Sequence, residues 1–157
     1  MQTNNKLDDI DRKILDILQE NGRITNTELA SRVGISPPPM LERVKKLEKK
    51  GIIQKYVALI DPDTIGKGTM ALVSVSLDRH RIKSIDQFTR AIEKIPEVME
   101  CYHITGEDDY VLKVAVKDIH EYENFILKKL TKLPALSKIK TSFILSTVKY
   151  ETKFPVE

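Results

Sequence analysis

The sequence predicts an α+β protein in which a helical N-terminal part precedes a part that alternates strands and helices. Apolar residues recur at helical spacing through the first fifty residues, and apolar–polar alternation appears after residue 69. The segments EKIPEV at 93–98 and TKLPAL at 131–136 also echo each other, because both read Lys, apolar, Pro, any residue, apolar. The echo indicates that the second part is built from a doubled unit.

Composition limits the classes of protein that fit. With 157 residues, 41% apolar and 31% charged, the chain is typical of a globular protein rather than a disordered one. The net charge is +3, so any signal for nucleic-acid binding must be local. The single cysteine, Cys101, cannot form an internal disulfide and favours a reducing compartment. The N-terminus lacks the layout of a signal peptide and no apolar run approaches about 20 residues, so we expect a cytoplasmic protein without a membrane partner.

The first two helices are predicted from spacing and from their ends. Apolar residues at helical spacing and a glycine at the end, Gly22, predict a helix over about 8–20. Thr25 and Glu28 fit a capping box, which starts a second, short helix that ends before Gly34. A short helix, a glycine turn and a longer helix have the layout of a helix-turn-helix.

The third helix follows three consecutive prolines at 37–39. Each proline disfavours the α conformation in the residue before it, so regular helix is expected near Pro39. Ser36 cannot cap this helix in the usual way, because Pro38 and Pro39 have no N–H to donate. We expect a stiff helix start that leaves phosphate binding to basic side chains.

The third helix is expected to have an apolar face and a basic face. A rotation of about 100° per residue puts Leu41, Val44 and Leu47 inward and Arg43, Lys46 and Lys50 outward. Residues 42–55 contain six basic and two acidic residues, which gives a local charge of +4. The basic face predicts contact with DNA, and the alternative is an ordinary solvated face.

The second part reads as strand, helix, strand, strand, helix, strand. Residues 52–60 are expected to form a strand that leaves the third helix, and DPDTIGKG at 61–68 a linker. A ferredoxin-like βαββαβ domain then covers 69–157. Helices cover only one face of such a sheet, so we expect the other face to bind a second copy of the chain.

TGEDDY at 105–110 joins the two middle strands. Gly106 permits a tight turn, and Glu107, Asp108 and Asp109 gather three carboxylates beside it. The turn is interpreted either as a ligand site or as an ordinary polar hairpin. A metal site of a hydrolase is weakly supported, because no second cluster of His, Cys or Asp accompanies the carboxylates. His103, nearby, is expected to be a packing or surface residue.

The segment LDDIDRKILDILQENGRITNTELASRVGISPPPMLERVKKLEKKGIIQKYVALIDPDTIG resembles the N-terminal half of the leucine-responsive and asparagine-responsive family of transcription regulators. The resemblance implies a winged helix-turn-helix. It implies DNA contacts by a set around the third helix: Ser36, Pro38, Pro39, Glu42, Arg43, Lys46 and Lys50. The family commonly has Ser or Thr at Pro38 and often a basic residue at Glu42. Glu42 could accept a hydrogen bond from cytosine or be repelled by phosphate, so the operator sequence does not transfer.

CYHITGEDDYVLKVAV is similar to the family's signature turn, whose Gly, Asp and aromatic residue match Gly106, Asp109 and Tyr110. In relatives this turn binds a free amino acid between dimers, helped by the last strand of a neighbouring subunit. The resemblance implies an effector site that includes Gly106, Glu107, Asp108, Asp109, Tyr110 and Thr141. Ile139 is apolar where some relatives have threonine. The resemblance also implies dimers that assemble into tetramers or octamers.

The sequence therefore predicts three domain ranges: a DNA-binding domain at 1–60, a linker at 61–68 and an effector-binding and oligomerisation domain at 69–157. The expected function is a transcription regulator that binds specific sequences of double-stranded DNA and responds to an amino acid, with no cofactor, metal or catalytic residue. One alternative is a nucleoid-organising protein that binds no effector, which the departure at Ile139 motivates. A small enzyme on a ferredoxin-like scaffold ranks last, since no paired nucleophile and base is visible.

Overall fold

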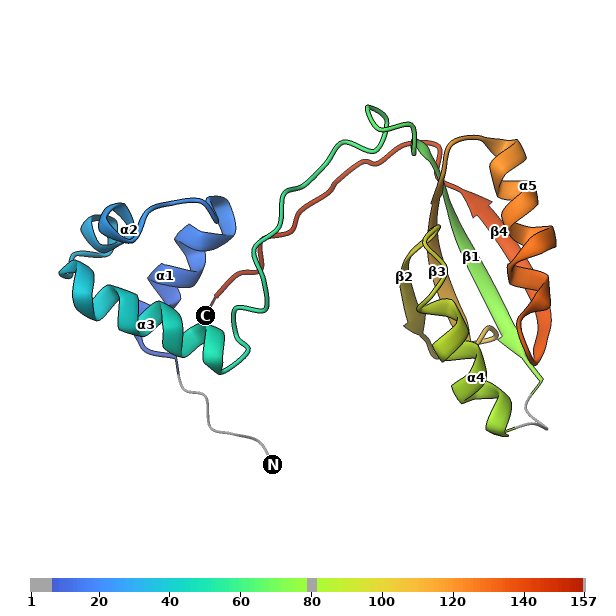
Figure 1. Ribbon diagram of the computed structural model, residues 1–157, viewed down its shortest axis with the longest axis horizontal. Helices are drawn as coiled ribbons and strands as arrows, with labels where there is room; N and C mark the ends of the chain where they lie inside the picture. Colours follow the sequence, from blue (N-terminus) through green and yellow to red (C-terminus); the bar gives the residue numbers. More distant parts are fainter. Residues whose placement is uncertain (1–6, 79–81, 157) are drawn as a thin grey trace. The chain divides into compact units, whose positions relative to one another are not determined.

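The structure is a computed structural model that describes residues 7–78 and 82–156. The chain forms two compact units, one made of residues 1–59 with 149–157 and the other of residues 60–148 (Figure 1). The C-terminal segment thus belongs to the first unit, whereas the sequence-based division placed it in the second domain. None of the described helices is long and apolar enough to cross a membrane.

Three helices with identifiable ends make up the first unit. Helix α1 spans Asp9–Glu20, and the Asp8 carboxylate caps it by accepting the N–H of Asp11 at 2.8 Å. Helix α2 spans Asn26–Val33; the Thr25 hydroxyl accepts the N–H of Glu28 at 3.2 Å. The Glu28 carboxylate binds Arg32 at 2.6 Å instead of returning to the Thr25 backbone. The structure therefore has one half of the predicted capping box.

The two glycines that bracket α2 have different functions. Gly34 ends the helix in the left-handed region at φ 88°, as expected for a helix C-terminus. Gly22 does not have a positive φ, so it does not end α1 in the left-handed conformation. A Cβ atom on Gly22 would lie 3.3 Å from the Tyr56 ring, which indicates that this glycine allows a close contact.

Helix α3 spans Pro37–Lys49, so it begins two residues earlier than predicted. The prolines occupy the first three helical positions, where backbone N–H groups have no acceptor within the helix. This fit outweighs the local preference for extended backbone before proline. Ser36 makes no capping bond with its side chain, as expected. The Asn26 side chain donates to the Pro37 carbonyl at 2.9 Å and ties α2 to the first turn of α3.

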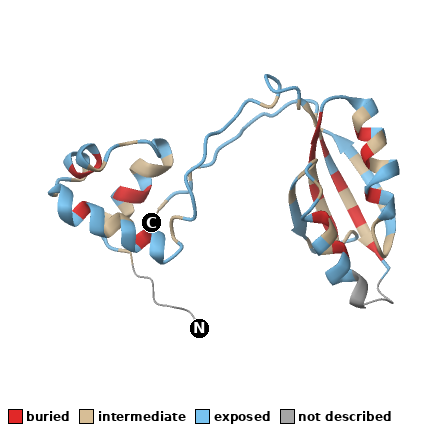
Figure 2. Cartoon of the chain, in the orientation of Figure 1, coloured by how far each residue is buried: buried red, intermediate tan, exposed pale blue. Residues whose placement is uncertain are grey.

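The core of the first unit corrects the predicted orientation of α3. Met40 is completely buried, whereas Leu41 is 42% exposed. Figure 2 shows that each of the three helices has both buried and exposed residues. The inward stripe is therefore Met40, Val44 and Leu47. Val44 and Leu47 are inward as predicted and Met40 takes the place of Leu41, so the helix is rotated by less than one residue from the predicted orientation. This cluster buries residues from all three helices: Ile14, Leu15, Leu29, Ala30, Met40 and Leu47.

Residues 52–60 were predicted to be a strand, and the structure assigns them none although it describes them all. Several side chains of this segment are exposed, including Val57 at 63% and Leu59 at 61%. Tyr56 is also exposed, at 48%, but its hydroxyl donates to the Glu48 carboxylate at 3.0 Å. Within this segment the N–H groups of Ile52 and Ile53 donate to the Leu47 carbonyl at 3.0 and 3.3 Å, and no backbone hydrogen bond joins residues 54–60 to another described segment.

The second unit has the predicted βαββαβ order. Its elements are β1 (Thr69–Leu77), α4 (Ile82–Ile92), β2 (Val98–His103), β3 (Tyr110–Val116), α5 (Ile119–Lys128), a 3₁₀ turn (Leu130–Lys132) and β4 (Leu136–Phe143). The sheet order is β2-β3-β1-β4, and every neighbouring pair is antiparallel. This order confirms the predicted ferredoxin-like arrangement.

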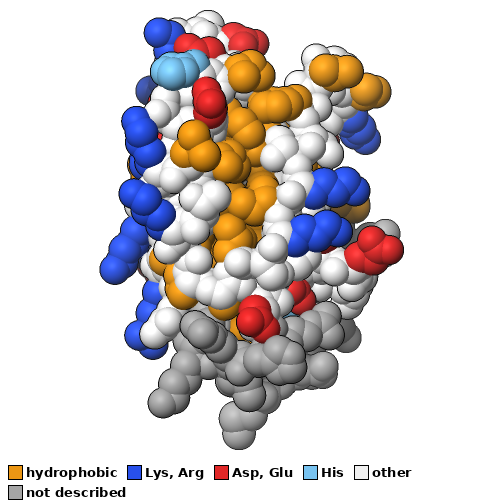
Figure 3. Space-filling view, turned by 90° about the vertical axis from the view of Figure 1, so that its right-hand side faces the viewer, with side chains coloured by type: hydrophobic (Ala, Val, Ile, Leu, Met, Phe, Trp, Pro, Cys, Tyr) orange, Lys and Arg blue, Asp and Glu red, His pale blue; other side chains and the backbone are white. Residues whose placement is uncertain are grey.

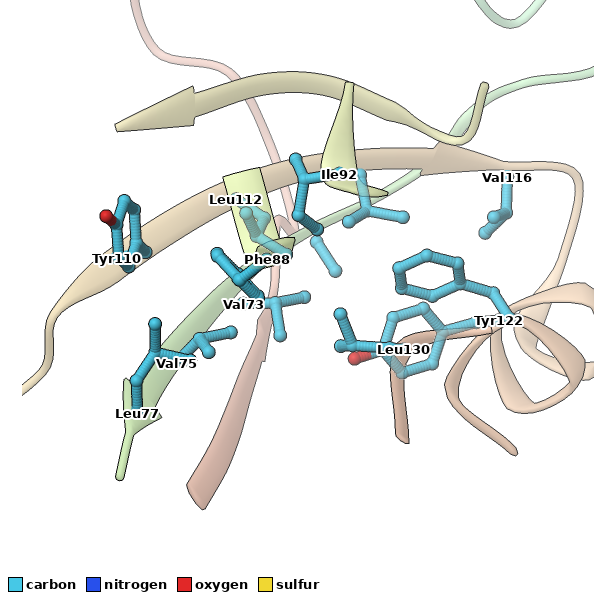
Figure 4. Close-up of a cluster of buried hydrophobic side chains, with 13 residues drawn as sticks. Val73, Val75, Leu77, Phe88, Ile92, Tyr110, Leu112, Val116, Tyr122 and Leu130 are labelled. Atoms are coloured by element: carbon cyan, nitrogen blue, oxygen red, sulfur yellow. The ribbon is translucent and has the colours of Figure 1, made fainter. Parts of the chain in front are cut away.

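Alternation along the strands makes one sheet face apolar. Val73 and Val75 of β1 and Leu112 of β3 are completely buried against Phe88 of α4 and Phe125 of α5, which is 1% exposed (Figure 4). Both helices therefore lie on the same face. The opposite face presents Leu72, which is 42% exposed, and the ion pair between Lys113 and Glu100 at 3.1 Å.

The internal echo has a structural counterpart. The residue after proline in each copy, Glu97 and Ala135, offers its carbonyl to a neighbouring segment: Ala115 N–H donates to Glu97 at 2.9 Å, and Asp78 N–H donates to Ala135 at 2.7 Å. Strands β2 and β4, which follow these residues, each have an irregular register near their start. The doubled unit read from the sequence is thus also a repeated hydrogen-bonding pattern.

Candidate functional site

The outward surface of α3 carries a group of lysines. At about 100° per residue, Lys45 and Lys49 lie opposite the buried Met40 and Leu47, with Lys46 beside them. All of these lysines and Lys50 are exposed. Lys45 has only a loose pairing with Glu42, at 3.5 Å. Within the described parts of the chain, no ion pair engages Lys46, Lys49 or Lys50.

Arg43 lies on the side of α3 that faces α1. Its guanidinium binds the carboxylates of Asp8 at 2.6 Å and Asp11 at 2.9 Å, and its side chain is 32% exposed. Hydrogen bonds to the two carboxylates, Asp8 first, raise the pKa of Arg43. The pKa of Asp8 is lowered, first by the N–H of Asp11 and then by Arg43. The expectation that Arg43 projects away from its own subunit is therefore wrong.

The remaining residues predicted to contact DNA are at the surface. Ser36, Pro38, Pro39 and Glu42 are all exposed around the first turns of α3. The start of α3 offers no proline N–H to a phosphate, and the Met40 N–H already donates to the Ser36 carbonyl at 3.3 Å. Binding of phosphates by this helix must therefore come from side chains.

In the second unit, the turn between β2 and β3 is held to β1. The Asp109 N–H donates to the Val75 carbonyl at 2.9 Å, and the Asp109 carboxylate accepts the Leu77 N–H at 2.7 Å. The Ser76 hydroxyl donates to Asp108 at 2.9 Å. Two of the three predicted carboxylates thus fix the turn in place, while Glu107 is exposed.

Gly106 and Tyr110 define the two sides of this turn. Gly106 is exposed and has φ 131°, which is strained for residues with a side chain. Tyr110 is 7% exposed, and its ring stacks on His103 with centroids 4.9 Å apart. A shallow hollow beside the turn is lined by Leu77, Ile85, His103, Asp109 and Tyr110. His103 is thus a surface residue that packs on Tyr110, in keeping with the sequence-based interpretation.

Thr141 lies elsewhere in the same unit. It is on β4, opposite Val73 of β1, and its hydroxyl is hydrogen-bonded to the Tyr122 hydroxyl of α5. Strand β1 separates β4 from β3, so Thr141 is about 10 Å or more from the strand that carries Tyr110. One chain by itself does not bring Thr141 to the Gly106 turn. Ile139, two residues earlier on the same face of β4, packs against the core.

Sequence reasoning missed the partners of Arg43. Asp8 and Asp11 were interpreted only as acids at a helix start, and the orientation of α3 that brings Arg43 to them depends on burying Met40 rather than Leu41. Nothing in the sequence indicated that the C-terminal segment contacts α1. Among the described residues, no group of three or more His, Cys, Asp or Glu is arranged to hold a metal ion.

These features define a two-domain regulator: a helix-turn-helix with unpaired lysines on its third helix, linked to an antiparallel sheet domain with a glycine turn. Residues 7–54 match the family described as winged helix-turn-helix DNA-binding, and residues 70–154 match the Lrp/AsnC ligand binding domain. The leucine-responsive regulatory proteins of Escherichia coli K12 and Salmonella typhimurium are each 38% identical over 96% of this chain and 92% of their own length.

Solved structures agree with the sequence matches. A transcriptional regulator from Neisseria meningitidis, solved as a complex with L-Met, has a TM-score of 0.91 and 39% identity, with 96% of this chain and 97% of that one covered. An AsnC family regulator from Agrobacterium tumefaciens has a TM-score of 0.89 and 35% identity, with 95% and 97% covered. The chain belongs to the Lrp/AsnC family of transcription regulators, which are not enzymes.

Proposed function

We propose that this regulator binds operator DNA in the cytoplasm through the lysines of α3, with Arg43 holding the helix against α1. The observation that carries the proposal is the exposure of Lys46, Lys49 and Lys50 without an ion-pairing partner in the described parts of the chain. Free ammonium groups can neutralise phosphates and release counterions. Ser36, Pro38, Pro39 and Glu42 surround these lysines and form the rest of the proposed contact surface.

Salt dependence of DNA binding tests this surface. A duplex selected from genomic fragments by the purified protein, and a scrambled version of it, would be titrated by fluorescence anisotropy at several salt concentrations. Each of Lys46→Ala and Lys49→Ala should weaken binding to both duplexes and reduce the slope of log K against log salt by about 0.9. Lys13→Ala, which removes an exposed lysine of α1, is the control. Unchanged slopes for both α3 variants would refute the proposed surface.

We also propose that a free amino acid binds at the Gly106 turn. The exposed backbone of Gly106 can approach a carboxylate closely, and Glu107 is an exposed group that can attract an ammonium group. Tyr110 and His103 provide an apolar wall. Because Thr141 is remote in the same chain, the proposed site is completed by Thr141 of a neighbouring copy. The Neisseria relative was solved as a complex with L-Met, which supports a free amino acid as the class of ligand.

Self-association is part of this proposal. The sheet face opposite α4 and α5 presents Leu72 and Val111 and is a suitable surface for a second copy. A further surface lies on the side of the second unit where α5 and β4 lie. There hydrophobic side chains form a stripe bordered by Lys and Arg, and Phe143 of β4 is 40% exposed (Figure 3). Two separate surfaces of this kind are suitable for a dimer and for assembly beyond it.

Calorimetry with each of the twenty amino acids tests the effector site. At least one should release or absorb heat with the wild-type chain and none with Gly106→Ala, because a Cβ atom at φ 131° strains the turn. Glu123→Ala on α5, an exposed residue away from the turn, is the control. Absence of heat with all twenty would favour the alternative of a DNA-organising protein without an effector. The departure at Ile139 does not decide between them, because Ile139 packs in the core.

A further inference from the structure

The C-terminal segment makes a specific contact with α1. The Lys153 ammonium group binds Asp16 at 2.7 Å and Glu20 at 2.6 Å, and its side chain is 28% exposed. The Gln19 side chain donates to the Phe154 carbonyl at 2.9 Å and accepts the Phe154 N–H at 2.7 Å. The contact therefore combines two ion pairs with a reciprocal pair of hydrogen bonds.

The face of α1 is suited to this segment. Asp16, Gln19 and Glu20 are three and four residues apart and so lie on one helix face. The carboxylates of Asp16 and Glu20, four apart, repel each other on an isolated helix. Lys153 lies against both and removes that repulsion. Val156 then packs against the hydrophobic cluster of the same unit.

The segment that follows α3, which also connects the first unit to the rest of the chain, is anchored as well. The chain leaves α3 through residues 52–60, and Tyr56 holds that exit by donating to Glu48 and by lying against Gly22. The first unit is thus joined to the rest of the chain by two covalent connections, one near residue 60 and one near residue 149. Each connection is anchored by side-chain contacts inside the unit.

We propose that residues 149–156 form a C-terminal strap that positions the DNA-binding unit, with Lys153 and Gln19 as its positioning residues. A unit joined by one flexible connection rotates freely, whereas one held at two points loses part of that freedom before it binds. When two units of an assembly bind two half-sites, lower freedom in the free state means a smaller entropic loss on binding. The strap therefore increases affinity for correctly spaced pairs of half-sites but not for a single half-site.

Binding to duplexes with different half-site spacings distinguishes a positioning role of the strap from a role in folding stability alone. The full-length protein would be titrated with three duplexes: two half-sites at the selected spacing, the same pair moved apart by about five base pairs, and one half-site alone. In the Lys153→Glu variant, a third acid faces Asp16 and Glu20 and the strap is released. We expect about tenfold weaker binding to the correctly spaced pair, a smaller preference over the shifted pair, and unchanged binding to one half-site.

Further variants serve as controls for the charge change at residue 153 and for the loss of the whole strap. Lys149→Glu makes the same charge change in the same segment at an exposed lysine, and should bind all three duplexes like wild type. The exchanged variant Lys153→Glu with Glu20→Lys should restore the spacing preference, and so should Lys153→Arg. A chain that stops after Tyr150 should behave like Lys153→Glu.

Two results would overturn the proposal. Wild-type spacing preference in Lys153→Glu and in the truncated chain would show that the strap does not position the unit. An equal loss on all three duplexes would assign the strap to folding alone. The inference rests on α3 as the DNA-binding surface, and that premise fails separately if the α3 lysine variants bind a single half-site as well as wild type.

Discussion

Arg43 is a basic residue of the third helix whose charge is already compensated inside the protein. An exposed ion pair contributes about 0–1 kcal/mol, so the contacts with Asp8 and Asp11 together are worth about 0–2 kcal/mol. A good bidentate contact with a base is worth about 1–3 kcal/mol, so breaking the ion pairs would offset part of that gain. Arg43 therefore gains less by turning to DNA than an unpaired arginine would. It is better explained as the residue that fixes the angle between α1 and α3.

The ion pair between Arg43 and Asp8 depends on pH, because the Asp8 carboxylate can be protonated. Its pKa is lowered from 3.8 by the Asp11 N–H and by Arg43, so its contribution to stability is fully present above pH 3.8 and is lost as the pH falls through the lower folded value. Asp8→Asn keeps a side chain that can cap α1 but removes the charge. We expect the variant to be less stable than wild type at pH 7 and the difference to shrink as the pH falls below 3.8, measured by urea unfolding.

Asp9→Asn is the control for this measurement. Asp9 pairs with Arg12 at 2.9 Å, but its side chain is 93% exposed, so removal of its charge should have little effect at any pH. A stability difference for Asp8→Asn that stayed constant between pH 7 and pH 2 would mean that the charge of Asp8 is not involved.

At the scale of whole elements, helices and strands were predictable where the signal is local. The acids at the start of α1, Thr25 before α2 and the alternation along β1 each specify an element through neighbouring residues alone. The prolines also indicated where α3 begins, within two residues. Features that depend on distant partners were not predictable in this way.

The rotation of α3 is the main example of such a feature. Met40 and Leu41 are adjacent and both apolar, so the periodicity fits either as the inward residue. Asn26 holds the first turn through the Pro37 carbonyl, and packing on α1 and α2 then selects Met40. The strand expected at 52–60 fails for a related reason, since apolar residues favour a strand but no strand among the described residues pairs with this segment.

Truncation of the two adjacent side chains tests the orientation of α3. Met40→Ala should reduce the free energy of unfolding by about 2–5 kcal/mol, because it leaves a cavity among completely buried residues. Leu41→Ala should change it by less than about 0.5 kcal/mol, because Leu41 is mostly at the surface. Urea unfolding followed by circular dichroism measures both. Similar losses for the two variants would mean that both residues face the core.

At the scale of the whole molecule, the distribution of charge and the grouping of residues into sites differ from what the sequence alone indicates. The net charge of +3 conceals a local +4 over residues 42–55, and the structure leaves most of those lysines unpaired among the described residues. The Gly106 turn was identified from the sequence, but its carboxylates were not expected to be bound to β1. Thr141 was predicted to belong to the same site, and only a second copy of the chain can bring it there.

The contact of Lys153 with α1 also has a consequence for protein synthesis. A ribosome makes α1 long before Lys153, so the three helices emerge early but lack the strap until residues 149–156 have been made. A chain released before those residues would carry all three helices and no strap. Under the proposal above, such a fragment could still contact a single half-site but would no longer favour correctly spaced pairs, which restricts full operator recognition to molecules that contain residues 149–156.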